Sequence, residues 1–144
     1  MHWPGFFSVE FVPLPEEELT PVIQGESFSI SSSPVRHMIP NIGLRIEFQP
    51  LGQVVAYSCD TEPAPEVVRL AIDADLLLHE ATGEEHGHST AAQAGLIARQ
   101  ANARRLLLIH YNPESVNPDQ LVEQAKTTFN GPVELARDFM EMVF

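Results

Sequence analysis

The chain of 144 residues is 44% apolar, and its 20 acidic and 8 basic residues give a formal net charge of −12. This length and apolar content support one folded domain and exclude a disordered chain. No apolar run reaches the roughly 18–20 residues of a membrane span and no signal-peptide pattern opens the chain, so we expect a cytoplasmic protein without a membrane partner. The acidic balance argues against non-specific binding of nucleic acid, and the single cysteine, Cys59, excludes an intramolecular disulfide or a multi-cysteine zinc site.

The first fifty residues predict short strands separated by prolines. Alternation of apolar and polar residues is typical of half-buried strands, and β-branched and aromatic residues favour them. The acidic run Glu16–Glu18 lies between two prolines and predicts a solvated loop or a single helical turn. The predicted strands of this part are Phe6–Val12, Ser27–Ser33 and Gly43–Phe48.

After Pro50 the pattern changes to alternating strands and helices. Proline is accepted at the first position of a helix and Ser or Thr caps one, so helices are predicted to begin at Pro65, at Ser89 or Thr90, and at Pro118. Continuous apolar strands separated by helices predict an α/β fold, with a sheet covered by helices on at least one face. The predicted strands of this part are Gln53–Tyr57, Asp75–Leu78, Arg105–Ile109 and Val133–Ala136.

Polar residues follow the buried strands where those strands end. Asp60 follows one strand, His79 and Glu80 follow the next, and His110 follows a third. Strand ends of such sheets open onto the crevice where ligands bind. With His37, which precedes a strand, Asp60 and His110 make a two-histidine, one-carboxylate set suited to zinc, manganese or iron. The alternatives are structural: Asp60 starts a turn, and a strand-end histidine bonds to backbone, because the spacing matches no local ligand motif.

Two further residues allow a catalytic and a structural interpretation. His88, in the segment EEHGHST, is either a general acid or a surface histidine before a helix. Glu80 is either a buried carboxylate that orients a histidine or an ordinary loop acid. Cys59 is interpreted as a small buried residue, because no histidine base is next to it in the sequence.

Four motifs in order, YSCDT, LLLHEAT, GHSTAAQAGLIARQANARRLLLIH and LARDF, resemble the second half of a metallo-β-lactamase-fold hydrolase. The resemblance is to the ribonuclease Z, phosphodiesterase and arylsulfatase branch, and it extends from about Ser33 to Phe139. It implies the C-terminal half of an αββα sandwich, an α/β fold whose mixed sheet has helices on one face. It also implies a dinuclear metal centre, usually of zinc.

The resemblance also implies roles for individual residues. His37 and His110 correspond to metal ligands, and Asp60 corresponds to a catalytic carboxylate that bridges two ions. The implied reaction is hydrolysis of a phosphodiester or other anionic ester by a metal-bound hydroxide. His88 resembles the histidine that assists the leaving group, and Glu80 resembles the carboxylate that orients it.

Two departures from the family pattern shape the expectations. The metal motif H-x-H-x-D-H is absent, so residues 1–144 are expected to be one partial domain that binds zinc, manganese or iron weakly or substoichiometrically. The short segment between His37 and Asp60 leaves no room for the arm with which family members grip transfer RNA. Together with the negative charge, this predicts a small anionic ester as substrate and argues against transfer RNA.

Three interpretations of the absent motif stay open. The chain is part of a hydrolase completed by an N-terminal half, or Met1 is not the true start, or the chain is a non-catalytic half-domain that acts in self-association or binding. A half sandwich exposes one face of its sheet, and a homo-oligomer would cover that face. In the last case the aromatic segment Trp3–Phe7 is the expected contact patch.

Overall fold

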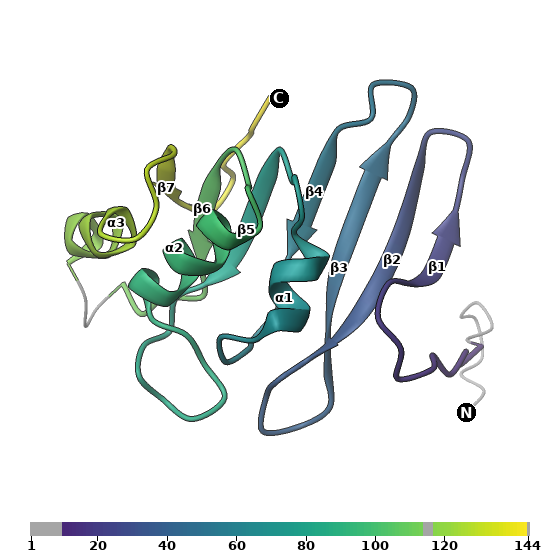
Figure 1. The fold of residues 1–144 in the computed structure, drawn as a ribbon, viewed down its shortest axis with the longest axis horizontal. Helices are drawn as coiled ribbons and strands as arrows, with labels where there is room; N and C mark the ends of the chain where they lie inside the picture. Colours follow the sequence, from purple (N-terminus) through teal and green to yellow (C-terminus); the bar gives the residue numbers. More distant parts are fainter. Residues whose placement is uncertain (1–9, 114–116, 144) are drawn as a thin grey trace, which may run out of the picture.

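The computed structural model describes residues 10–113 and 117–143, which form a mixed seven-stranded sheet with three helices on one face (Figure 1). The strands follow the chain order across the sheet, from β1 at one edge to β7 at the other. The strands are β1 (Thr20–Gln24), β2 (Phe28–Val35), β3 (Asn41–Phe48), β4 (Val54–Tyr57), β5 (Leu76–Glu80), β6 (Leu106–Ile109) and β7 (Val133–Leu135). The helices are α1 (Pro65–Leu70), α2 (Ala91–Gln100) and α3 (Pro118–Lys126).

The sheet has an antiparallel half and a parallel half. Strands β1 to β4 pair antiparallel, and β4 to β7 pair parallel. Antiparallel neighbours need only short turns, whereas each parallel pair needs a crossover connection, and α1, α2 and α3 supply the three crossovers. The C-terminal ends of β4, β5 and β6 therefore meet at one edge, together with the loop between β2 and β3.

The main core lies between the sheet and the helices. Small side chains on α2 let it pack closely, and Gly95 is required because a Cβ there would lie 2.4 Å from the carbonyl oxygen of Ala125 in α3. Thr90 accepts a hydrogen bond from the Gln93 backbone N–H, and the Gln93 side chain accepts one in return. Of the two predicted caps, Thr90 is thus the residue that begins α2.

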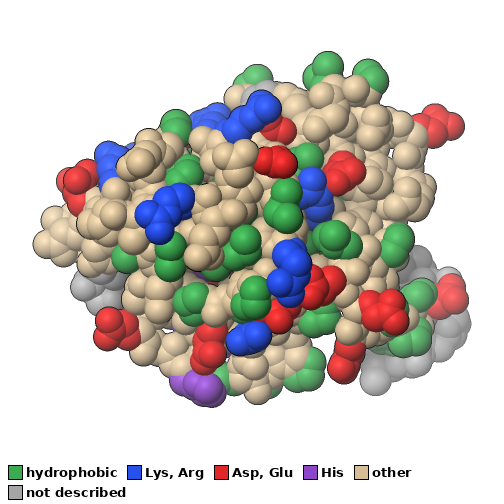
Figure 2. All heavy atoms as spheres, in the orientation of Figure 1, with side chains coloured by type: hydrophobic (Ala, Val, Ile, Leu, Met, Phe, Trp, Pro, Cys, Tyr) green, Lys and Arg blue, Asp and Glu red, His purple; other side chains and the backbone are tan. Residues whose placement is uncertain are grey.

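The helix-free face of the sheet carries a smaller apolar cluster built on Val55, Leu76 and Leu107. The C-terminal segment crosses this face, and Met140 and Met142 line one side of an apolar groove of about 420 Å³. On the opposite, helix-covered face, acidic and basic side chains are interspersed (Figure 2). The described part of the chain contains no helix with the length and apolarity needed to span a membrane.

Several predicted elements differ from the observed ones. The first residues of the predicted strand Phe6–Val12, and the patch Trp3–Phe7, lie outside the described residues, while residues 10–12 are not a strand. Strand β1 was not predicted because its sequence, TPVIQ, contains a proline; β1 is an edge strand with a register shift after Pro21, which is where a sheet tolerates proline. The acidic run Glu16–Glu18 lies in a loop, as predicted.

Candidate metal centre

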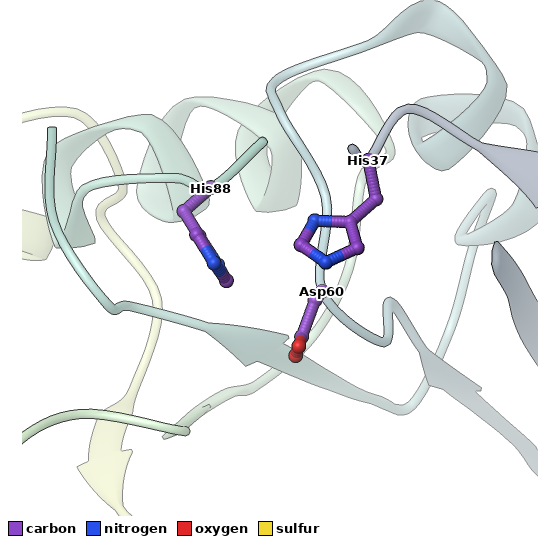
Figure 3. Close-up of side chains that lie close together, drawn as sticks. All are labelled: His37, Asp60 and His88. Carbon is purple, nitrogen blue, oxygen red and sulfur yellow. The ribbon is translucent and has the colours of Figure 1, made fainter. Parts of the chain in front are cut away.

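Four loops at one edge of the sheet bring the predicted site residues together. His37 comes from the β2–β3 loop, Asp60 follows β4, His88 precedes α2, and His110 follows β6. Figure 3 shows the side chains of His37, Asp60 and His88 directed toward a shared space. Residues far apart in the sequence meet here because parallel strand ends share an edge.

The potential ligand atoms form two overlapping groups. Within each group they all lie within 4.8 Å of one another: one consists of His37, Asp60 and His88, the other of Glu80, His88 and His110. The His88 ring centroid lies 4.9 Å from that of His37 and 5.7 Å from that of His110. Among the described residues, the trio predicted from sequence, His37, Asp60 and His110, forms neither group. His88 belongs to both groups, whereas His37 and His110 belong to one each. Nothing in the spacing of the segment EEHGHST indicated this central position.

Each of the three histidines has its Nδ1 atom engaged by an oxygen. His37 Nδ1 lies 2.8 Å from the carbonyl oxygen of Gly87, and His110 Nδ1 lies 2.9 Å from Asp60 Oδ1. His88 Nδ1 lies 3.1 Å from Glu80 Oε1. Carbonyl and ionised carboxylate oxygens only accept hydrogen bonds, so Nδ1 carries the proton in each ring. Each Nε2 is then left with its lone pair when the ring is neutral, as a metal ligand requires.

Glu80 is the buried anchor of the site. Its side chain is 0% exposed, and its carboxylate accepts hydrogen bonds from the backbone N–H groups of Thr61, Thr82 and Ser89 at 3.2, 2.8 and 2.8 Å. The fourth donor is His88, whose side chain is 10% exposed. Glu80 therefore fixes the loops after β4 and β5 relative to each other and orients the His88 ring.

The loop that carries His88 depends on Gly87. This residue has φ +84°, and a Cβ there would lie 2.8 Å from His37 Nδ1 and 3.1 Å from a Met38 side-chain carbon. The Gly87 N–H donates to Glu62 Oε1 at 3.0 Å. Sequence reasoning did not single out Gly87 or Glu62, although a glycine between two histidines is a signal of close backbone approach.

We expect Gly87→Ala to displace His37 and to lower the free energy of unfolding by about 1–3 kcal/mol, because the substitution adds both backbone strain and a clash. Gly83→Ala is the matched control: Gly83 has φ +135°, and a Cβ there meets nothing within 4 Å. Imidazole resonances of His37 in NMR spectra should shift in the Gly87 variant only. Equal shifts in both variants would show that strain, not the contact with His37, is responsible.

Strained backbone marks the two points where strands turn into the site. Cys59 has φ +54° and His110 has φ +49°, in the left-handed region that non-glycine residues rarely adopt. Cys59 also contacts Tyr57. Burial, reinforced by a hydrogen bond with Cys59, raises the pKa of Tyr57 to about 12, so the phenol stays neutral at physiological pH.

His79 is not on the crevice floor, where its position after a predicted strand had placed it. It lies inside β5 and is fully buried, with Nδ1 2.8 Å from the carbonyl oxygen of Glu80. Burial lowers the pKa of His79, which favours the neutral ring. It belongs to neither group of potential ligands among the described residues, and its role is structural.

The donor set fits a divalent metal ion. Imidazole nitrogen and carboxylate oxygen are the ligands of zinc, manganese and iron sites, and both groups of potential ligand atoms consist of these donors. Figure 3 shows the donors of one group, His37, Asp60 and His88, directed toward one another. Backbone or carboxylate acceptors on the opposite ring nitrogen are typical of metal-binding histidines.

Comparisons with known proteins show the family and the fold. Residues 3–111 match the model of a β-lactamase superfamily domain. Ribonuclease Z of Myxococcus xanthus is 43% identical over 96 residues, which are 60% of this chain and 31% of that protein. The metallo-β-lactamase-fold protein YhfI from Bacillus subtilis superposes with a TM-score of 0.73 and 29% identity, over 81% of this chain and 49% of that one. For the short form of human tRNase Z the TM-score is 0.62 and the identity 28%, over 83% and 44% of the two chains.

The comparisons contradict the expectation about transfer RNA, and they show that the chain matches only part of its relatives. The chain spans about a third of the length of the Myxococcus protein, so most of that relative has no counterpart in it. The expectation that argued against transfer RNA is wrong, because the relatives are named ribonuclease Z and tRNase Z. The net charge is a sum over the whole chain and does not describe the charge at one local site. The short segment between His37 and Asp60 excludes only the arm with which family members grip transfer RNA.

Proposed function

We propose a function that follows from family membership, because the chain belongs to the β-lactamase superfamily and to its ribonuclease Z-like branch. The chain supplies part of the active site of a metal-dependent phosphodiester hydrolase acting on RNA. The observation that carries the proposal is the convergence of His37, Asp60 and His110 around the buried pair of His88 and Glu80. A histidine and carboxylate cluster of this kind combines metal ligands with a proton donor.

His37, Asp60 and His110 would contribute ligands to a metal centre, which we propose to hold zinc, with manganese or iron as alternatives. When bound, the ion supplies Lewis acidity toward the scissile phosphate and lowers the pKa of bound water. As the imidazolium, His88 would donate its Nε2 proton to the leaving oxygen and become neutral, while its Nδ1 stays bound to Glu80. Glu80 keeps the imidazole in that orientation.

The domain is proposed to be completed by a segment that carries the motif H-x-H-x-D-H. The support is that the chain covers 49% of the YhfI chain while matching its fold, and that the helix-free face of the sheet carries an apolar groove. Metal binding by residues 1–144 alone is accordingly weak, and substoichiometric below saturating metal, because the ligands of the missing motif do not contribute.

Metal titration tests the proposal directly. We expect zinc or cobalt to bind the chelator-treated protein, and His37→Ala, Asp60→Asn and His110→Ala each to weaken binding at least about 10-fold. His86→Ala is the control: His86 lies one residue from Gly87, but its side chain is 83% exposed and it belongs to neither group of potential ligands. Zinc content after reconstitution gives the stoichiometry.

An occupancy under about 0.2 equivalents at saturating zinc would contradict metal binding by this chain, because a folded site fills nearly completely. An equal loss of affinity in the His86 variant would show that the histidines bind zinc non-specifically. Either result would favour the alternative of a non-catalytic half-domain, in which the apolar groove of the helix-free face is the binding surface.

A further inference from the structure

The basic side chains of this acidic chain are almost all neutralised within it. All eight lie in the described residues, and six of them form ion pairs with carboxylates. The two basic residues without an ion pair in the described part of the chain are Arg99 and Arg137, and both are exposed. Arg99 is in the last turn of α2, where a cation interacts favourably with the helix dipole. Arg137 has no such explanation.

Arg137 stands beside the candidate metal centre. Strands β6 and β7 are parallel, with Leu108 paired with Leu135, so His110 and Arg137 each follow the last paired residue by two positions at the same end of the two strands. His110 and Arg137 both line a cavity of about 540 Å³ at this end of the two strands. The cavity therefore extends from a proposed metal ligand to Arg137, which has no ion pair among the described residues.

The backbone that carries Arg137 is fixed to the segment after β6. The Tyr111 hydroxyl donates a hydrogen bond of 2.8 Å to the carbonyl oxygen of Ala136. The Ala136 N–H donates one of 2.9 Å to the carbonyl oxygen of Leu108. These bonds tie the residues directly before Arg137 and directly after His110 to each other. The side chain of Arg137 is thus exposed on a positioned backbone, which suits a group that binds a ligand.

We infer that Arg137 binds a phosphate of single-stranded RNA next to the scissile phosphodiester, which rests on the proposed function. A guanidinium makes two parallel hydrogen bonds to the oxygens of one phosphate, and an RNA strand presents another phosphate one nucleotide from the reacting one. Asp138 also lines the cavity and opposes the binding of an anion. Both side chains are exposed, so solvent screens the non-directional repulsion from Asp138, whereas the two hydrogen bonds of a guanidinium to one phosphate do not depend on charge alone.

Fluorescence anisotropy with a fluorescein-labelled single-stranded RNA octanucleotide tests this inference, with the whole chain and with zinc or EDTA present. We expect Arg137→Gln to weaken binding about 5- to 10-fold and to reduce the slope of log K against log salt by about 0.7, the value for one phosphate contact on a single strand. Arg137→Lys should keep the salt slope and part of the affinity, and Asp138→Asn should tighten binding.

Arg99→Gln is the matched control, because it removes the same charge from an exposed arginine outside the cavity. Identical titrations of the Arg137 and Arg99 variants would overturn the inference, and so would a wild-type chain that does not bind the octanucleotide. Both results are distinct from failure of the proposed function, which is read from zinc uptake by the His37, Asp60 and His110 variants and needs no RNA.

Discussion

Replacing Glu80 by alanine is expected to lower the free energy of unfolding by about 3–5 kcal/mol, the largest stability effect anticipated in this chain. The Glu80 side chain is fully buried and accepts hydrogen bonds from three backbone N–H groups and from His88. Its removal leaves four donors without this acceptor, and the two that are buried, the N–H groups of Thr61 and Ser89, each cost roughly 1–3 kcal/mol before the loops relax. Urea unfolding followed by circular dichroism measures the loss.

Two further variants make the Glu80 experiment specific. Glu85→Ala removes an exposed carboxylate from the same loop, and we expect its free energy of unfolding to stay within about 0.5 kcal/mol of the wild type. Glu80→Gln retains one acceptor oxygen but introduces an NH₂ group toward N–H donors. Its free energy of unfolding should therefore lie between those of the wild type and the alanine variant. A Glu80→Ala chain as stable as the Glu85 variant would show that Glu80 does not hold the loops together.

Replacing His88 by alanine is expected to slow phosphodiester hydrolysis by about 10²- to 10⁴-fold, the usual contribution of a general acid. The effect should depend on the leaving group. A ribonucleotide leaving group needs a proton, whereas p-nitrophenolate leaves without one, so hydrolysis of bis(p-nitrophenyl) phosphate should be much less affected. Rates for both substrates are measured with the metal-loaded protein in the presence of the segment that carries H-x-H-x-D-H.

This comparison separates the two roles that the geometry allows for His88. Its ring lies within ligand distance of both groups of donors, so it could also bind the ion. Loss of a ligand would slow both substrates equally and lower the zinc content, and that outcome would contradict the role of proton donor. His86→Ala, an exposed histidine two residues away, should leave both rates and the zinc content unchanged.

Much of the fold followed from local patterns. The alternation after Pro50 predicted β4, β5, β6 and β7 within a few residues, because buried parallel strands are continuous apolar runs with helices between them. Local rules failed where position in the sheet mattered. Strand β1 contains a proline, which is not typical of a strand in the sequence. The segment is a strand because β1 lies at the edge of the sheet, where proline is tolerated.

For the site, the sequence by itself indicated His37, Asp60 and His110 as a set, and the family resemblance added His88 and Glu80; the structure brings these residues together in two overlapping groups. Polar residues at the ends of buried strands share one edge of a parallel sheet, and the order of motifs indicated the family. The tertiary structure alone decided what those residues contact. The central position of His88, the four donors around Glu80 and the place of Arg137 beside His110 depend on loop packing and strand register. Those are set by contacts between segments far apart in the chain, which no local pattern encodes.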